Sequence, residues 1–199
     1  GSVVVVGRRL EPLEETAGAN PDRIAAVRGD VGEPGEAARL VAAAVERFGR
    51  IDAVVNNAGR WDIVAFDERA TDELILATIM VNQFGPMAMV REALDQLTEH
   101  SGCVVNLSTT GTKVPQKGNA IYASSKAAVE QLTRNLAHEL GRRGIRVNAV
   151  APGATDTEML MPYVSEAAAE ATIKRTPLGR FGTPDDIAKV ILFLVSDDA

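Results

Sequence analysis

The chain has 199 residues, a net charge of −6 and a single cysteine. This length suits one domain with a single core, and 46% hydrophobic with 24% charged residues is typical of a soluble globular protein. The acidic balance argues against a nucleic-acid-binding surface, and the lone cysteine excludes an internal disulfide. No apolar run approaches the ~18 residues that span a bilayer, so we expect a cytoplasmic protein without a membrane segment.

Short runs rich in β-branched residues alternate along the chain with longer segments of helical periodicity. Strands are expected at residues 3–6, 24–27, 53–55, 103–107 and 145–150. Helices are expected at residues 11–17, 33–48, 80–97, 121–140 and 185–195. The strands are apolar almost throughout, which indicates burial on both faces and predicts a doubly wound parallel sheet in one α/β domain covering residues 1–199.

Polar loops follow several of the expected strands. In a doubly wound sheet, ligands bind beyond the carboxyl ends of the strands. The sequence Asn-Asn-Ala-Gly at 56–59 follows one strand, Ser108 and Thr109 follow another, and the loop 152–157 follows a third. Each loop alone is typical of an ordinary turn. Taken together, they predict a ligand site at this edge of the sheet.

Tyr122 and Lys126 are four residues apart, which places both side chains on one face of the expected helix. A free tyrosine has a pKa near 10 and is a poor base at neutral pH. A neighbouring ammonium group favours the phenolate, so we expect Lys126 to lower the pKa of Tyr122. Two residues on a solvated helix face are the alternative, because this spacing is common.

Three further groups of polar residues are candidates for the same site. A hydroxyl from Ser108 or Thr109 can bond a substrate carbonyl oxygen beside the tyrosine. Asn82 is polar within a helix expected to be mostly buried, where it either satisfies local backbone or lines a site. The threonine hydroxyls of the loop 152–157 can meet an amide group.

The ordered set of motifs resembles the short-chain dehydrogenase/reductase family, in its soluble single-domain branch. Asn-Asn-Ala-Gly, Tyr-x-x-x-Lys and Pro-Gly-x-x-x-Thr occur in the family's order and approximate spacing, and the resemblance covers residues 3–198. It implies a Rossmann-like fold and hydride transfer between NAD(P) and a small carbonyl or alcohol substrate. No metal site is expected.

The resemblance also implies roles for individual residues. Tyr122 would be the general acid/base, Lys126 would lower its pKa and hold the nicotinamide ribose, and Asn82 would support a water-borne proton relay. The cofactor-binding residues that it implies are Asp30 and Val31 at the adenine, Asn57, Ala58 and Gly59 along the dinucleotide, and Pro152, Gly153, Thr155 and Thr157 at the nicotinamide amide.

The substrate-orienting hydroxyl departs from the family's pattern. The family places a serine thirteen positions before the tyrosine, and that position here is Thr109. Threonine supplies the same hydroxyl on a stiffer side chain, so we favour Thr109, with the preceding Ser108 as the alternative.

A second departure is that no glycine-rich phosphate-binding turn occurs in the sequence. The family places this turn in a first strand-helix unit of ~30 residues ahead of the strand at 3–6, and it usually adds a last strand after 198. Without these units we expect a gap in the sheet between the strands 3–6 and 53–55, with unpaired backbone groups. We also expect the 199-residue chain to bind dinucleotide weakly.

The turn after the first expected strand indicates the cofactor. It contains Arg8 and Arg9 where an NAD-preferring relative usually has an acidic residue for the ribose 2′-hydroxyl. An arginine can bind a 2′-phosphate through two parallel hydrogen bonds, whereas two solvated arginines are the alternative. We therefore expect NADP, with NAD possible.

The region 157–176 corresponds to a lid over the substrate in the family, and Trp61 is a further candidate for the pocket. The apolar residues of the region 157–176 favour a lipophilic or mixed carbonyl substrate, although the same residues would suit core or subunit contacts. The helices 80–97 and 121–140 commonly make dimer contacts in relatives, so a homodimer or homotetramer is expected. A non-catalytic dinucleotide-binding or scaffold protein is the rival hypothesis.

Overall fold

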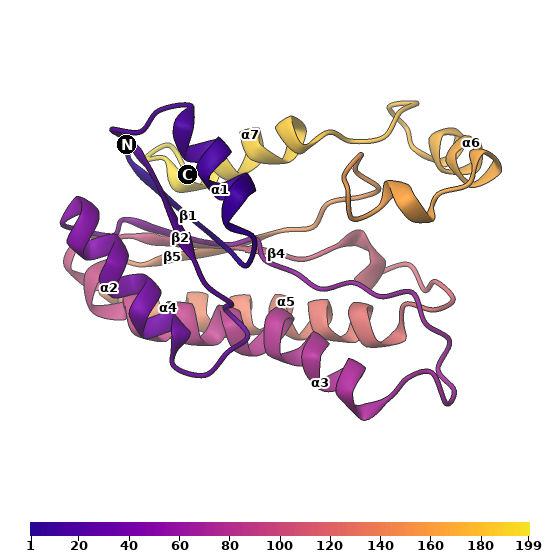
Figure 1. Ribbon diagram of the computed structural model, residues 1–199, viewed down its shortest axis with the longest axis horizontal. Helices are drawn as coiled ribbons and strands as arrows, with labels where there is room; N and C mark the ends of the chain where they lie inside the picture. The colour runs from indigo at the N-terminus through magenta and orange to yellow at the C-terminus, as the bar shows by residue number, and fades with distance from the viewer.

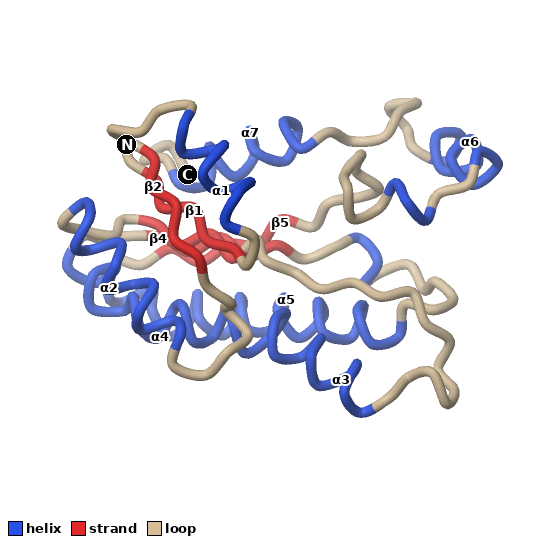
Figure 2. The backbone as a smooth tube through the Cα atoms, viewed as in Figure 1, coloured by secondary structure: helices blue, strands red, loops and turns tan.

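The computed structural model describes residues 1–199 and shows an α/β fold in which the strands lie between two groups of helices (Figure 1). Figure 2 shows the strands as a central layer. The strands are β1 (Val3–Gly7), β2 (Ile24–Arg28), β3 (Ala53–Asn56), β4 (Cys103–Leu107) and β5 (Arg146–Val150). The helices are α1 (Leu10–Gly18), α2 (Glu36–Phe48), α3 (Asp72–Ile79), α4 (Gly85–Glu99), α5 (Ala120–Leu140), α6 (Glu166–Arg175) and α7 (Pro184–Val195).

All strand pairs are parallel, as the apolar strand pattern predicts. β1 pairs with β2, and β3, β4 and β5 pair in that order, with β4 in the middle. No ladder joins the two sheets, so a break in hydrogen bonding separates the strands β1 and β3. The sequence leads us to expect a gap at this place.

The main core lies between the sheet β3-β4-β5 and the helices α2, α4 and α5. Every residue of β4 is buried, and its Val104 contacts buried side chains from these helices. On the other side of the strands, α1 and α7 have no buried residue (Figure 1). The layer that contains α5 is therefore the better packed one, and α5 carries Tyr122 and Lys126.

The expected helix 80–97 is longer and less regular in the structure. Helical backbone begins at Asp72, where the Thr71 side chain accepts a hydrogen bond from the Leu74 N–H and so caps α3. A π-helical turn at Met80–Phe84 then leads into α4. The Thr71-Asp72-Glu73 sequence is typical of a helix start, but helical periodicity is clear only from residue 80, so the expected helix begins too late.

Two other helices differ from the sequence-based expectation. α2 begins at Glu36 rather than at residue 33, because Gly35 precedes it with a φ of 89°, outside the helical region. α6 has no expected counterpart; Ser165 caps its start by accepting a hydrogen bond from the Ala168 N–H. None of the α6 side chains is buried. A helix that buries no face needs no apolar stripe, and without a stripe the sequence does not predict this helix.

The helical segment Asp72–Glu99 bears on the expectation that the chain has no membrane segment. Its 28 residues contain a window with mean hydropathy 1.3, which by length and composition alone is sufficient for a span. In this structure α4 packs against β3, β4 and α2, and the side chains of Val90, Ala93 and Leu97 belong to the main core. The segment is a core helix of the domain.

We expect Leu97→Ala to lower the free energy of unfolding by ~2–5 kcal/mol, because removal of a fully buried leucine leaves a cavity. Leu97 is 0% exposed, whereas Leu192 on α7 is 68% exposed and serves as the matched control. Urea unfolding of both alanine variants checks this prediction. Equal losses at the two positions would contradict the placement of the core.

Candidate active site

A cleft of about 1230 Å³ lies at the carboxyl ends of the strands. Ligand pockets commonly measure roughly 300–1,000 Å³, so this cleft has room for a large ligand. The loops after β1, β2, β3, β4 and β5 and the start of α5 all contribute to its wall. It is lined by Arg8, Arg9, Asp30, Val31, Asn57, Ala58, Gly59, Ser108, Thr109, Tyr122, Lys126, Pro152, Gly153, Thr155 and Thr157.

Tyr122 and Lys126 both lie in this cleft, in the first two turns of α5. Lys126 is only 4% exposed, and its Nζ donates a hydrogen bond of 2.8 Å to the Leu107 carbonyl oxygen. That oxygen belongs to the last residue of β4, so the lysine ties the helix to the end of the middle strand. An ammonium has three donors, so two remain for other partners.

Burial controls the pKa of both groups. Burial lowers the pKa of the Lys126 ammonium to about 8. Burial also raises the pKa of the Tyr122 phenol above its ordinary value of 10.0, and the Thr109 side chain opposes this by hydrogen bonding. The net shift of the Tyr122 pKa is therefore upward in this structure, and the expectation that Lys126 lowers it stays a prediction. Both pKa values shift because removal from water disfavours the charged form of each group.

The hydroxyls of Ser108 and Thr109 have different surroundings. Ser108 is 4% exposed, and its Oγ donates a hydrogen bond of 2.8 Å to Glu130 Oε1, away from the tyrosine. Thr109 Oγ1 accepts a hydrogen bond of 3.1 Å from the Gly111 N–H, which leaves its own proton free to donate. Of the two candidates, Thr109 is the one with a free hydroxyl proton, and its side chain lowers the pKa of Tyr122 by hydrogen bonding.

Asn82 lies in the π-helical turn and is 0% exposed. Its Oδ1 accepts a hydrogen bond of 2.7 Å from the Arg60 N–H, and its Nδ2 donates to the Arg60 carbonyl at 2.9 Å and to Ser125 Oγ at 2.8 Å. Asn82 thus fixes the loop after β3 against α5. A Cβ at Gly59 in that loop would lie 3.5 Å from Lys126 Nζ, an ordinary van der Waals distance, so the loop runs directly beside the lysine.

The two arginines after β1 stand at the other end of the cleft and have different partners. Arg8 lies 3.9 Å from the Asp30 carboxylate, and Arg9 lies 3.4 Å from the Glu158 carboxylate. Both guanidinium side chains are largely exposed, and such surface pairs are weak. Both are therefore able to exchange these partners for an anionic ligand.

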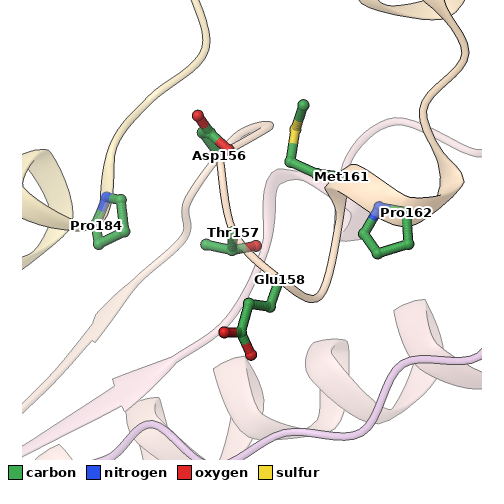
Figure 3. Close-up of a pocket in the computed structure, with 6 residues that line it drawn as sticks. All are labelled: Asp156, Thr157, Glu158, Met161, Pro162 and Pro184. Carbon is green, nitrogen blue, oxygen red and sulfur yellow. The ribbon is translucent and has the colours of Figure 1, made fainter.

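The loop after β5 is joined to the loop after β4. The Ser108 N–H donates to the Val150 carbonyl at 2.8 Å, and the Thr110 N–H donates to the Pro152 carbonyl at 3.0 Å. Thr157 lies further along this loop, between Asp156 and Glu158, whose side chains point in opposite directions (Figure 3). The threonines at 155 and 157 therefore belong to the same cleft wall as the β4 loop.

Aromatic side chains stand beside Tyr122. The Trp61 ring centroid is 6.1 Å from that of Tyr122 and 5.5 Å from that of Tyr163. The Trp61 Nε1 donates a hydrogen bond of 2.6 Å to Asn119 Oδ1, which orients the indole. Trp61 thus connects the loop after β3, the start of α5 and the short helix that contains Tyr163.

Sequence reasoning misses three polar residues around this site: Ser125, Asn119 and Glu130. Ser125 Oγ donates to the Tyr122 carbonyl at 2.7 Å and accepts from Asn82. Only Ser125 has a local signal, because it directly precedes the lysine of the Tyr-x-x-x-Lys motif. Asn119 contacts the ring of Trp61, and Glu130 contacts Ser108 and Thr112; these partners are distant in sequence, so no local pattern reveals the contacts.

The lowered pKa of Lys126 predicts a pH dependence of stability. The folded pKa is about 8 and the ordinary value is 10.5, so between these values the unfolded chain binds more protons than the folded one. Relative to Lys126→Met, the wild-type free energy of unfolding should therefore rise as pH increases from about 8 toward 10. Urea unfolding of both proteins across this interval checks the sign; parallel curves would contradict it.

Comparisons with known proteins identify relatives of this chain. The model of the family described as "Enoyl-(Acyl carrier protein) reductase" matches residues 2–199. A 3-oxoacyl-[acyl-carrier-protein] reductase of Thermotoga maritima is 35% identical over an alignment that covers 100% of this chain and 82% of that protein. An L-rhamnose 1-dehydrogenase (NAD(P)(+)) of a Sphingomonas species is 38% identical, with 89% of this chain and 70% of that protein covered.

Solved structures show the same fold. The 3-ketoacyl-(acyl-carrier-protein) reductase of Brucella melitensis, complexed with NADH, matches with a TM-score of 0.93 at 30% identity, covering 100% of this chain and 82% of that chain. The gluconate 5-dehydrogenase of Burkholderia cenocepacia, in complex with NADP and tartrate, matches with a TM-score of 0.91 at 27% identity, covering 98% and 78%. The chain belongs to the short-chain dehydrogenase/reductase family of oxidoreductases.

Proposed function

We propose that the protein transfers a hydride between NADP(H) and a small carbonyl or alcohol substrate, with Tyr122 as the general acid/base. The observation that supports this most directly is the convergence of Tyr122, Lys126 and Thr109 in one cleft at the carboxyl ends of the strands. The phenol lies beside a free hydroxyl donor, and the lysine has donors to spare.

In this proposal the substrate carbonyl oxygen accepts hydrogen bonds from the Thr109 hydroxyl and the Tyr122 phenol. When bound, the nicotinamide ring supplies the hydride for reduction or accepts it for oxidation. As the carbonyl carbon is reduced, its oxygen takes the phenolic proton, and the charge left on Tyr122 is stabilised by the Lys126 ammonium. The water-borne relay through Asn82 stays a prediction; the side-chain hydrogen bonds of Asn82 join it to Arg60 and Ser125.

The environment of the phenol keeps its proton bound. Because its pKa is raised, Tyr122 is protonated at neutral pH and is ready to donate. Lys126, with a pKa of about 8, is mostly charged at the same pH. A protonated phenol beside an ammonium is suited to reducing a carbonyl, whereas oxidation of an alcohol first requires loss of the phenolic proton.

The residues at both ends of the cleft fit NADP. Arg8 and Arg9 offer two exposed guanidinium groups for a 2′-phosphate, and Lys126 offers free donors for a ribose hydroxyl. Asp30 Oδ1 already accepts the Gly32 N–H at 2.9 Å, which orders the turn assigned to the adenine. One structural relative was solved with NADP and another with NADH, so NAD use is compatible with this fold.

The substrate pocket is the part of the cleft that Trp61, Tyr163 and Met159 line. Met159 is 44% exposed and Tyr163 is 60% exposed, so both can contact a bound molecule. Their chemistry suits a carbonyl compound with an apolar body. We further propose a cytoplasmic homodimer or homotetramer, with no nucleic-acid or membrane partner.

Tyr122→Phe should lower kcat for carbonyl reduction by about 10²–10⁴, because only the proton donor is removed. The melting temperature should stay close to that of the wild type, since the ring is retained. NADPH oxidation with phenanthrenequinone and ethyl acetoacetate as probes measures the rate. Retained turnover in the variant would overturn the role of Tyr122, and a wild type that binds NADPH without oxidising it would favour a non-catalytic dinucleotide-binding protein.

Arg8→Asp and Arg9→Asp should each weaken NADPH binding by about tenfold or more, because a charge-assisted contact to the 2′-phosphate becomes a repulsion. NADH lacks this phosphate, so its affinity should change much less. Calorimetric titration with both cofactors makes the comparison, and Arg91→Asp on α4, outside the cleft, is the control. An unchanged preference for NADPH in both variants would reject the assignment.

A further inference from the structure

The Glu130 carboxylate lies beneath the turn that follows β4 and binds three side chains of that turn. Its Oε1 accepts hydrogen bonds from Ser108 Oγ at 2.8 Å and from Thr112 Oγ1 at 2.6 Å. Its Oε2 accepts one from Lys113 Nζ at 2.7 Å. The carboxylate is 11% exposed, whereas the lysine is 70% exposed. Glu130 is not among the residues that line the cleft.

The hydrogen bonds keep Glu130 charged. Burial raises the pKa of this carboxyl, but the hydrogen bonds from Lys113, Thr112 and Ser108 outweigh burial and lower the pKa to about 2. A buried carboxylate without such partners would be strongly destabilising. Lys113 makes the largest single contribution to this lowering, and the two hydroxyls are the partners that connect the carboxylate to the residues around Thr109.

These two hydroxyls belong to residues on either side of Thr109. Ser108 directly precedes it, and Thr112 follows it by three positions. Thr112 Oγ1 is also 3.0 Å from the Thr109 carbonyl oxygen, and the Gly111 N–H of the same turn donates to Thr109 Oγ1. The hydrogen bonds from Ser108 and Thr112 to Glu130 therefore fix the backbone around Thr109. They also fix the Gly111 N–H, which orients the Thr109 hydroxyl.

We propose that Glu130 is a positioning residue, which holds the turn 108–112 so that the Thr109 hydroxyl faces the Tyr122 phenol. Glu130 touches neither the phenol nor the cleft, and it acts through Ser108 and Thr112. The kinetic consequence rests on the proposed function, because Thr109 and Tyr122 act there on the same carbonyl oxygen. The geometric consequence does not depend on it.

The titration of Tyr122 provides a readout that needs neither substrate nor cofactor. The chain contains only two tyrosines, so in a Tyr163→Phe background the ultraviolet absorbance of phenolate reports Tyr122 alone. The Thr109 side chain lowers the pKa of Tyr122, and loss of its orientation should therefore raise that pKa. Thr109→Ala in the same background sets the size of the effect.

Two variants of Glu130 separate hydrogen bonding from charge. Glu130→Gln keeps an acceptor oxygen for both hydroxyls, whereas Glu130→Met has a similar length and no such acceptor. Both remove the negative charge, which by itself would lower the pKa of Tyr122. We expect Glu130→Met to raise this pKa by about one unit relative to Glu130→Gln, the size of one lost hydrogen bond to a charged oxygen.

Kinetics and a second substitution complete the test. Glu130→Met should lower kcat about tenfold with little change in KM, and Glu130→Gln should restore most of the rate. Thr112→Val breaks the same anchor from the other side and should shift the pKa of Tyr122 in the same direction, which decides the matter if Glu130→Met does not fold. Glu139→Met, at an exposed position of α5, should have no effect.

The proposal is overturned if the pKa of Tyr122 is the same in Glu130→Met and Glu130→Gln, or in Thr112→Val and the wild type, while Thr109→Ala raises it. It is also overturned if Thr109→Ala leaves this pKa unchanged. A shifted pKa in a protein without carbonyl reductase activity would instead support the positioning role and remove the proposed function.

Discussion

The hydrogen bond from Lys126 Nζ to the Leu107 carbonyl, 2.8 Å long, is the contact on which the site depends. It joins the second turn of α5 to the last residue of β4, the middle strand of its sheet. Because β4 is buried throughout, its end is a fixed point, and the lysine brings Tyr122 to that point. Asn82 and Ser125 then attach the loop after β3 to the same helix. The cleft is therefore built around one strand end.

Burial of the two side chains explains the electrostatics around Tyr122 and Lys126. Burial raises the pKa of Tyr122, which keeps its proton bound, and lowers the pKa of Lys126. The arrangement provides a proton donor at neutral pH and a cation whose charge depends on pH near 8. Glu130 is the opposite case, because three hydrogen bonds keep a poorly exposed carboxylate ionised. Burial at Tyr122 and Lys126, and hydrogen-bond partners at Glu130, therefore set the pKa values of these groups.

Much of the fold follows from the sequence because its signals are local. The apolar β-branched run at Cys103–Leu107 predicts β4 with the bounds that the structure shows. Tyr122 and Lys126 share a helix face because of their spacing, and the loops after the strands meet because parallel strands end at one edge. These features need only short-range periodicity and one topological rule.

The rest depends on contacts between distant segments, which periodicity does not reveal. The π-helical turn at Met80–Phe84 accompanies the contact of Asn82 with Arg60, and Glu130 acquires its role from hydroxyls 18 and 22 positions away. The direction of the Tyr122 pKa shift is also beyond the spacing argument, because it is set by burial, which outweighs the hydrogen bond with Thr109. Sequence spacing predicts which groups are neighbours, but it does not predict which of them are buried.

The transfer of an isotopic label tests the proposed chemistry most directly. NADPH with deuterium at the transferable position of the nicotinamide is incubated with the protein and ethyl acetoacetate, whose reduction gives a secondary alcohol, and the product is analysed by mass spectrometry and NMR. If the cleft around Tyr122 and Lys126 supports hydride transfer, the alcohol carries deuterium on the former carbonyl carbon. An alcohol without deuterium, or no alcohol while the label stays on the cofactor, would contradict this account.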